Sequence, residues 1–200
     1  MNLNSVLNMS KKEDMEKISI LVSNCKKCKL YKTRTKPVFG DGSKNSDLLF
    51  IGEAPGRNED IDGTPFVGRA GKILNDLLES IGLQRNEVYI ANILKCRPPK
   101  NKNPMKNEIK ICTKYLDKQI DIIKPKIIVP LGNFASKYIF DKFDLEHDKI
   151  RSIRGKTYKT NNSIGNIIII PIYHPAAAIY DPNKKNILLE DFKIIKKNIF

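Results

Sequence analysis

Four cysteines are the residues of this 200-residue chain whose spacing most directly suggests chemistry. Cys25 and Cys28 form a CxxC pair, and Cys96 and Cys112 follow with fifteen residues between them. One close pair and two distant cysteines can converge on a single four-thiolate centre, which suits either tetrahedral zinc or an iron–sulfur cluster. Such a centre would tie the N-terminal part of the chain to its middle. Four buried cysteines without a metal are the alternative interpretation.

A long, acid-rich loop follows the first apolar run of the chain. From Ile51 to Gly71 the sequence reads IGEAPGRNEDIDGTPFVGRAG, which carries glycines, prolines and four acidic side chains. Loops of this length are usually functional or disordered, and open α/β sheets bind their ligands at the carboxyl ends of strands. Because Gly52 and Gly56 allow the backbone to approach a ligand closely, we expect a pocket here.

Two more polar side chains stand at the ends of other apolar runs. Asn92 lies near the end of the run at residues 88–94, and His174 directly follows the run at residues 166–172. A side chain at the carboxyl end of a strand faces the ligand crevice of an α/β sheet. His147, the other histidine, lies in a polar stretch and is expected to be solvated.

The elements that must position these residues alternate between strand and helix. Short apolar runs predict strands at residues 47–51, 88–94, 127–131 and 166–172. Apolar positions at helical spacing predict helices at residues 13–23, 70–80, 107–124, 132–140 and 183–198. Residues 1–12 are expected to be frayed, and residues 141–162 to be a polar excursion. The alternation predicts one α/β domain over residues 1–200, with a mainly parallel four-stranded sheet covered by helices on both faces.

The composition favours a polyanionic partner over a membrane. The chain carries 36 basic and 22 acidic residues, a net charge of +14. Such a balance indicates a nucleic acid partner, with a lysine-rich solubilising surface as the alternative. The sequence contains neither a run of about eighteen apolar residues nor the apolar core of a signal peptide. We therefore expect a cytoplasmic, monomeric protein without membrane contact.

Six short motifs in order, together with the cysteine spacing, resemble the family 4 uracil-DNA glycosylases, the iron–sulfur type. The motifs are GEAPG at 52–56, PFVGRAG at 65–71, NILKCRPP at 92–99, PLG at 130–132, RGK at 154–156 and HP at 174–175. The resemblance extends from about Cys25 to the last predicted helix. It implies a three-layer α/β/α fold and hydrolysis of the N-glycosidic bond of deoxyuridine in single- and double-stranded DNA. It also favours a [4Fe–4S] cluster over zinc at Cys25, Cys28, Cys96 and Cys112.

The resemblance assigns roles to residues around the expected pocket. Phe66 matches the aromatic ring that stacks on uracil, Asn92 the amide that reads its edge, and His174 the histidine of the second motif. A hydrogen-bond donor at uracil O2, such as His174, would stabilise the departing anion. The resemblance implies Glu53 and His174 as catalytic residues. The full substrate-binding set is Gly52, Glu53, Ala54, Phe66, Asn92 and His174.

The position of the attacking water stays open at this point. Other branches of the glycosylases carry an aspartate where this chain has Ala54, so that carboxylate is absent here. Glu53 is one candidate to hold water against the sugar, and its alternative role is to accept backbone N–H groups of the loop. Glu59 or Asp62 could contact the water or the loop backbone instead.

Basic and exposed residues around the pocket are candidates for contact with DNA. Arg97, Lys100 and Lys102 flank a cysteine of the metal centre, and Arg154 with Lys156 belongs to a small basic turn. Many family members have a Tyr-Leu-Leu-Arg run after the HPA motif, but this chain has Ala177-Ala-Ile-Tyr180. We therefore expect Ile179 or Tyr180 to fill the vacated base stack. The alternative function is a catalytically inactive iron–sulfur or zinc protein that binds nucleic acid with the same fold.

Overall fold

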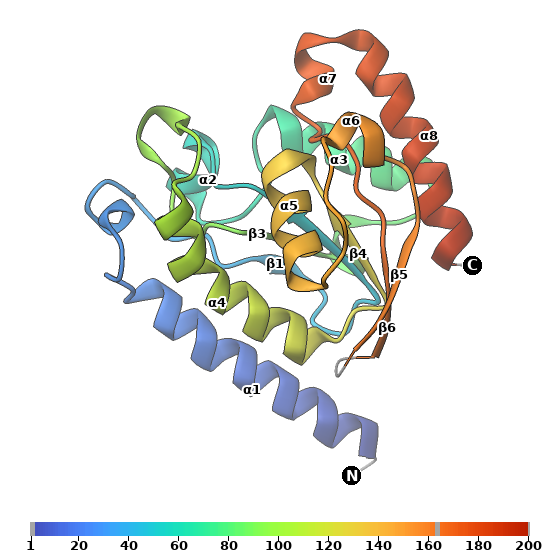
Figure 1. Ribbon diagram of the computed structural model, residues 1–200. Helices are drawn as coiled ribbons and strands as arrows, with labels where there is room; N and C mark the ends of the chain where they lie inside the picture. Colours follow the sequence, from blue (N-terminus) through green and yellow to red (C-terminus); the bar gives the residue numbers. More distant parts are fainter. Residues whose placement is uncertain (1–2, 163–164, 200) are drawn as a thin grey trace.

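The computed structural model describes residues 3–162 and 165–199, and a six-stranded sheet lies at its centre (Figure 1). The strand order is β1-β3-β2-β4-β6-β5. The strands are β1 (Asp41–Gly42), β2 (Leu48–Gly52), β3 (Tyr89–Asn92), β4 (Ile127–Pro130), β5 (Tyr158–Asn162) and β6 (Gly165–Ile169). The four inner strands are parallel, and they correspond to the four predicted from the sequence. The expectation of only four strands is wrong, because β1 and β5 add antiparallel edges.

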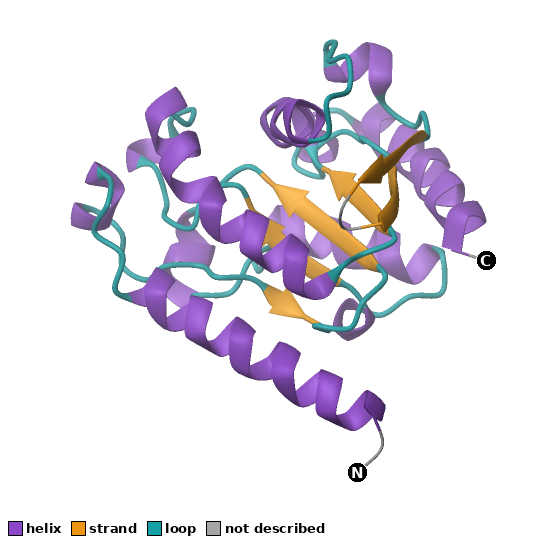
Figure 2. Cartoon of the chain, turned by 60° about the horizontal axis from the view of Figure 1, so that its bottom comes forward, coloured by secondary structure: helices purple, strands orange, loops and turns teal. Residues whose placement is uncertain are grey.

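Helices cover both faces of the sheet and give a three-layer α/β/α architecture (Figure 2). The α-helices are α1 (Leu3–Ser23), α2 (Arg57–Asp62), α3 (Arg69–Ser80), α4 (Lys106–Ile123), α5 (Gly132–Lys142), α6 (Ile150–Ile153), α7 (Ala177–Tyr180) and α8 (Pro182–Ile199). Three short 3-10 helices are η1 (Lys29–Lys32), η2 (Arg85–Glu87) and η3 (Pro99–Asn101). Helices α1, α4 and α5 pack on one face, and α3 and α8 on the other.

Alternation along the strands explains why both faces are covered. Leu49 and Ile51 of β2 belong to the core shared with α1, α4 and α5, whereas Leu48 and Phe50 belong to the core shared with α3 and α8. Successive side chains of a strand point to opposite faces, so an entirely apolar strand needs a helical layer on each side. The apolar runs of the sequence thus specify the layering.

Several elements differ from the sequence-based expectation. Helix α1 begins at Leu3 rather than near residue 13, so residues 3–12 are helical where fraying was expected; residues 1 and 2 lie outside the described residues. Helix α2 forms inside the acid-rich loop, and α6 and β5 form inside the expected polar excursion. These segments lack their own apolar periodicity, and β5 is held by its antiparallel pairing with β6.

The parallel strands place their carboxyl ends at one edge of the sheet. Gly52 at the end of β2 is in register with Asn92 at the end of β3. On the other side, Leu131 after β4 pairs with Ile172 after β6, so the next residues of both segments also lie side by side. This edge is where the chain gathers its candidate functional residues.

Candidate functional site: a pocket at the carboxyl edge of the sheet

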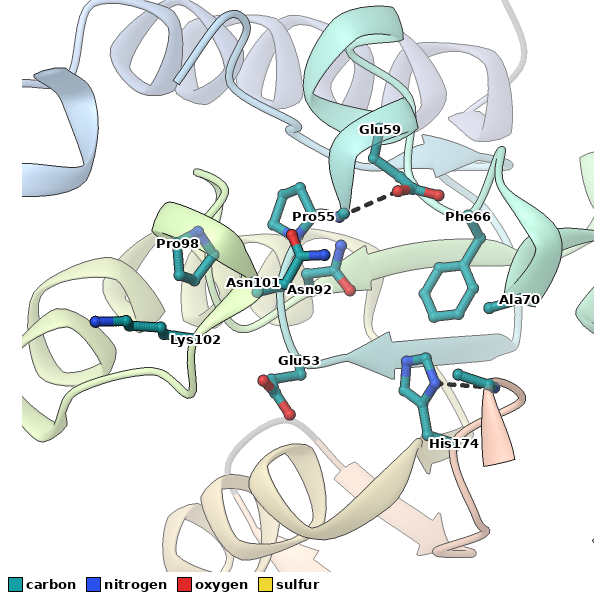
Figure 3. Close-up of a pocket in the computed structure, with 13 residues that line it drawn as sticks. Glu53, Pro55, Glu59, Phe66, Ala70, Asn92, Pro98, Asn101, Lys102 and His174 are labelled. Atoms are coloured by element: carbon teal, nitrogen blue, oxygen red, sulfur yellow. Dashed lines mark hydrogen bonds between the residues drawn. The ribbon is translucent and has the colours of Figure 1, made fainter. Parts of the chain in front are cut away.

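A cavity of about 300 Å³ lies at this edge, and residues from distant parts of the chain line it (Figure 3). Glu53 follows β2, Phe66 precedes α3, Asn92 ends β3 and His174 follows β6. All four line the cavity, together with Ala54. The structure therefore brings together the four residues that the sequence analysis placed in one pocket.

Gly52 allows two of these side chains to meet. A Cβ atom at this position would lie 2.3 Å from Asn92 Oδ1 and 2.8 Å from the ring of Phe66. Both distances are shorter than real Cβ contacts, so any larger residue would displace the amide or the ring. Gly52 is not among the residues that line the cavity, so the structure shows it making room for Asn92 and Phe66 rather than approaching a ligand itself.

The ring of Phe66 is held by an unusual backbone conformation. Its φ of 54° is in the left-handed region, which bulky residues seldom adopt. The Arg85 guanidinium donates to the carbonyl oxygens of Pro65 and, at 3.2 Å, of Phe66 itself. At Gly71, a Cβ atom would lie 1.8 Å from the Phe66 carbonyl oxygen. The sequence analysis missed Arg85, because nothing in its neighbourhood connects it with a loop twenty residues earlier.

Asn92 presents an unused acceptor to the cavity. Its side chain is only 2% exposed, and its Oδ1 atom has no hydrogen-bond partner among the described residues. A buried polar atom without a partner costs free energy, on the order of 1–3 kcal/mol. An N–H donor on a ligand in the cavity would remove this cost.

His174 is fixed as a neutral hydrogen-bond donor. Its Nδ1 atom accepts the backbone N–H of Ala176 at 3.1 Å, so the proton of the neutral ring is on Nε2. Burial lowers the pKa of His174 to about 4, although the Glu59 carboxylate acts in the opposite direction. The ring also stacks on Phe66, with centroids 5.5 Å apart and planes inclined by 24°. The pocket therefore holds an uncharged imidazole at neutral pH.

Of the four acidic residues of the loop, Glu59 and Asp60 hold backbone N–H groups, whereas Glu53 and the exposed Asp62 have no side-chain hydrogen bond within the described residues. Asp62 does not line the cavity, so Glu53 is the unengaged carboxylate of the site. Glu59 accepts the backbone N–H groups of Gly56 at 3.0 Å, Val67 at 3.0 Å and Gly68 at 2.9 Å. Asp60 is buried and accepts the N–H of Thr35 at 3.0 Å. Glu59 thus performs the loop-holding role that the sequence left open between it and Glu53.

Glu53 makes no side-chain hydrogen bond within the described part of the chain. It is half-buried in the wall of the cavity, and burial raises the pKa of its carboxyl group. Figure 3 shows its carboxylate on the same side of the cavity as His174. This carboxylate is available for a ligand or a water molecule.

The four cysteines also converge, at a second place near the ends of α1 and α4. Cys25, Cys28, Cys96 and Cys112 line one small cavity together with Arg34. Arg34 Nη1 donates to Cys96 Sγ at 3.0 Å, and the backbone N–H of Lys95 donates to Cys112 Sγ at 3.1 Å. Burial raises the pKa of Cys96, and that of Cys112 to about 12, so these thiols need a bound cation to ionise. The donor set therefore fits a metal centre that binds thiolates.

The candidate DNA-contacting residues lie in different settings. Lys100 and Lys156 are exposed, and Lys102 lines the pocket. Arg97 Nε donates to Asn101 Oδ1 at 2.8 Å, which holds the loop that borders the pocket.

Arg154 has a different partner from the predicted phosphate. Its guanidinium pairs with the fully buried Asp191 of α8, and it also lies over the ring of Tyr173. The pair joins α8 to the end of α6, and the contact with Tyr173 places it beside the segment that carries His174. Of the two wedge candidates, Ile179 is half-buried and Tyr180 is 81% exposed.

The fold and the pocket define an α/β/α protein with a candidate ligand pocket at the carboxyl ends of its parallel strands. A model of the Uracil DNA glycosylase superfamily matches residues 39–193. The chain is similar to the type-4 uracil-DNA glycosylase of Sulfurisphaera tokodaii, with 50% identity over 92% of this chain and 84% of the relative. It is also similar to those of Archaeoglobus fulgidus (46% identity; 92% of each chain) and Saccharolobus solfataricus (45%; 92% and 86%).

The chain belongs to the uracil-DNA glycosylase superfamily, and within it to the type-4 family. The family predicted from the six motifs and the cysteine spacing is thereby confirmed. Over residues 3–162 and 165–199, no helix has the length and apolarity needed to cross a membrane.

Proposed function

We propose that this protein is a uracil-DNA glycosylase, which hydrolyses the N-glycosidic bond of deoxyuridine in single- and double-stranded DNA and leaves an abasic site. The observation that carries this function is the buried Asn92 Oδ1, unpartnered among the described residues, in one cavity with Phe66 and His174. Uracil has an N3–H flanked by two carbonyl oxygens. The Asn92 amide can accept from N3–H and donate to O4, whereas cytosine has a bare N3 and an amino group.

Cleavage of the glycosidic bond leaves negative charge on uracil and positive charge on the sugar. Nε2–H of His174 is the donor that we assign to uracil O2, because Nδ1 is already used as an acceptor. A neutral donor stabilises the departing anion without first requiring a proton from solvent. Phe66 offers its ring as the stacking platform, in a position that Arg85 and Gly71 maintain.

Glu53 is the group that we assign to the attacking water. Its carboxylate is unengaged within the described ranges, whereas Glu59 is occupied by three backbone N–H groups. A carboxylate near the sugar also favours the cationic transition state. Burial raises the pKa of Glu53, which makes its carboxylate a stronger base than an exposed one.

The metal centre that best suits the four cysteines is a [4Fe–4S] cluster rather than zinc. Four sulfurs bound to one zinc ion lie about 3.8 Å from each other, since each Zn–S bond is about 2.3 Å. In the described part of the chain, no three His, Cys, Asp or Glu side chains are close enough to hold a single ion. Each of the four cysteines would supply one thiolate to a cluster, which does not require all four sulfurs to lie that close together. A bound cluster would serve a structural role, because it would join the segment after α1 to the loop that lines the pocket.

Contact with DNA falls to the exposed cations around the pocket and to one wedge. Lys100, Lys102 and Lys156 can neutralise phosphates. Arg97 supports the loop that carries Lys100 and Lys102 through its hydrogen bond to Asn101. Tyr180 is the residue that we assign to the vacated base stack, because most of its side chain is exposed directly after the His174 segment.

Uracil release tests the proposed function directly. Purified protein is incubated with single- and double-stranded oligonucleotides that contain one deoxyuridine, and free uracil is measured before the DNA is treated with alkali. We expect free uracil and strand breaks only after alkali, because Phe66, Asn92 and His174, the residues assigned to the base, carry no amine nucleophile for lyase chemistry. Intact strands after alkali would overturn the assignment and leave an inactive nucleic-acid-binding protein with this fold.

A further inference from the structure

A second hollow, of about 430 Å³, lies beside the four cysteines and outside the uracil pocket. The turn after α1 and the 3-10 helix η1 form one side, and the first turn of α4 forms the other. We call it the lysine hollow, after the four lysines that line it: Lys26, Lys27, Lys29 and Lys32.

One segment of chain joins the lysine hollow to the uracil pocket. Pro98, Asn101 and Lys102 line the pocket, and Met105 and Asn107 line the hollow a few residues later. A DNA strand that leaves the pocket along this segment would therefore arrive at the lysines. The pocket and the hollow are thus lined by successive parts of the segment at residues 98–108.

The charge of the lysine hollow is strongly positive. All four lysines are exposed, and none of them forms an ion pair within the described ranges. The one carboxylate in the lining, Glu108, is 6% exposed and accepts the backbone N–H of Met105 at 2.9 Å. Such a concentration of exposed cations attracts phosphate groups.

An aromatic ring in the lining favours a nucleic acid strand over a free anion. Tyr31 is half-buried between Lys29 and Lys32 in the sequence and lines the hollow with them. Met105 adds an apolar side chain that is 57% exposed. Surfaces that follow a DNA strand combine cations for the backbone with rings on which bases stack.

We propose that the lysine hollow binds the phosphate backbone of the DNA strand flanking the extruded nucleotide. This proposal rests on the proposed function, because that function supplies the DNA strand in the neighbouring pocket. The hollow then adds phosphate contacts beyond those of Lys100, Lys102 and Lys156. Its contribution is to affinity and placement of the strand, and no reacting atom touches it.

A charge-removal variant tests the lysine hollow by its salt dependence. Lys26→Gln, Lys29→Gln and Lys32→Gln are combined, and Lys27 is kept because its ammonium lies over the ring of Tyr115. The matched control combines Lys118→Gln, Lys196→Gln and Lys197→Gln, three exposed lysines that line neither cavity and form no ion pair within the described residues. Binding of undamaged duplex DNA is measured over a range of salt concentrations, so the readout does not depend on catalysis.

The two variants are expected to differ clearly. Loss of three phosphate contacts makes the negative slope of log K against log salt shallower by about 2 to 3. KM for uracil-containing DNA rises on the order of tenfold near physiological salt. The control keeps the slope of the unaltered protein. Equal slopes in the two variants would overturn the proposal, even if the unaltered protein releases uracil. Loss of visible absorbance in the triple variant would mean that the proposed iron–sulfur cluster is lost. In that case the single variant Lys32→Glu is used in the same assay, because Lys32 is the farthest of the three lysines from Cys28 in the sequence.

Shortened substrates test the position of the bound strand. Oligonucleotides with uracil at increasing distance from the 5′ or the 3′ end are compared by their KM. We expect that shortening one flank raises KM for the unaltered protein and has little further effect on the triple variant, since its lysines no longer contact that flank. If shortening either flank affects both proteins equally, the hollow does not hold the flanking strand.

Discussion

The imidazole of His174 stacks on the ring of Phe66, with their centroids 5.5 Å apart. The proposed leaving-group donor and the proposed stacking platform are therefore fixed against each other before any DNA binds. The two residues are 108 positions apart in the sequence, and the parallel strands bring their segments together at one edge of the sheet. A base that enters the cavity meets an arrangement that is already formed, which limits the reorganisation that catalysis requires.

Burial of His174 makes the stability of the fold depend on pH. Its pKa is about 4 in the folded protein and near 6.5 when exposed, so the unfolded chain binds the extra proton between these values. The contribution is fully present above about pH 6.5 and is lost as the pH falls towards 4. His174→Phe keeps an aromatic ring against Phe66 but removes the titrating group.

Urea unfolding of the two proteins at pH 7.5 and 4.5 measures this effect. We expect the unaltered protein to lose on the order of 2 kcal/mol more than His174→Phe between the two pH values. Parallel losses of stability in both proteins would show that His174 is not held neutral by burial.

The two glutamates of the loop are expected to respond differently to the same change. Glu59→Gln replaces a carboxylate that accepts three backbone N–H groups, so it should destabilise the protein by about 1–3 kcal/mol. Glu53→Gln removes a carboxylate that holds no structural contact in the described ranges, so it should lower kcat at least tenfold with little change in stability.

Thermal unfolding and single-turnover uracil release, measured on both variants, separate the roles. The assignment of the water to Glu53 would fail if Glu53→Gln were as active as the unaltered protein. It would also fail if Glu59→Gln lost activity while keeping its full stability.

Arg85 is expected to act on catalysis through the position of Phe66. Arg85→Lys keeps the charge but loses the fork that binds the carbonyl groups of Pro65 and Phe66. We expect kcat/KM for uracil-containing DNA to fall roughly tenfold, because the stacking ring is no longer held in its left-handed conformation. Arg151→Lys, a change at an exposed arginine, is the control. Unchanged kcat/KM in Arg85→Lys would show that the loop holds Phe66 without it.

Arg34 is expected to protect the metal centre. Its guanidinium bridges Cys96 Sγ, at 3.0 Å, and the carbonyl oxygen of Ser23 at the end of α1, at 2.9 Å. Hydrogen bonds to cysteine sulfurs tune iron–sulfur centres and fix their ligands. In Arg34→Gln, visible absorbance should decay faster in air and the reduction potential should become more negative. Lys32→Gln, at an exposed lysine nearby, is the control, and equal decay in the two variants would contradict the role of Arg34.

The sequence predicted the parts of the fold that depend on local pattern. The four inner strands are short apolar runs with turn residues around them, and the site residues that the motifs indicated lie at their carboxyl ends. The edge strands β1 and β5 are polar, and they become strands through pairing with neighbours that are distant or weakly marked in the sequence. Local pattern alone could not specify them.

The site residues that sequence reasoning missed depend on long-range contacts. Arg85 reaches a loop twenty residues away, and Arg34 reaches a cysteine sixty-two residues away. Arg154 belongs to a basic motif, yet the buried Asp191 on α8 engages it. A basic residue shows its charge in the sequence but not its partner, so such assignments need coordinates.

Uracil release by Asn92→Asp is the measurement that tests the central claim most directly. Single-turnover rates are compared with those of the unaltered protein, and binding of undamaged DNA serves as the control for folding. We predict a rate at least a hundredfold lower with unchanged DNA binding, because an aspartate can no longer donate to uracil O4 while it accepts from N3–H. Uracil release at the unaltered rate would show that Asn92 does not read the base and would contradict the pocket described above.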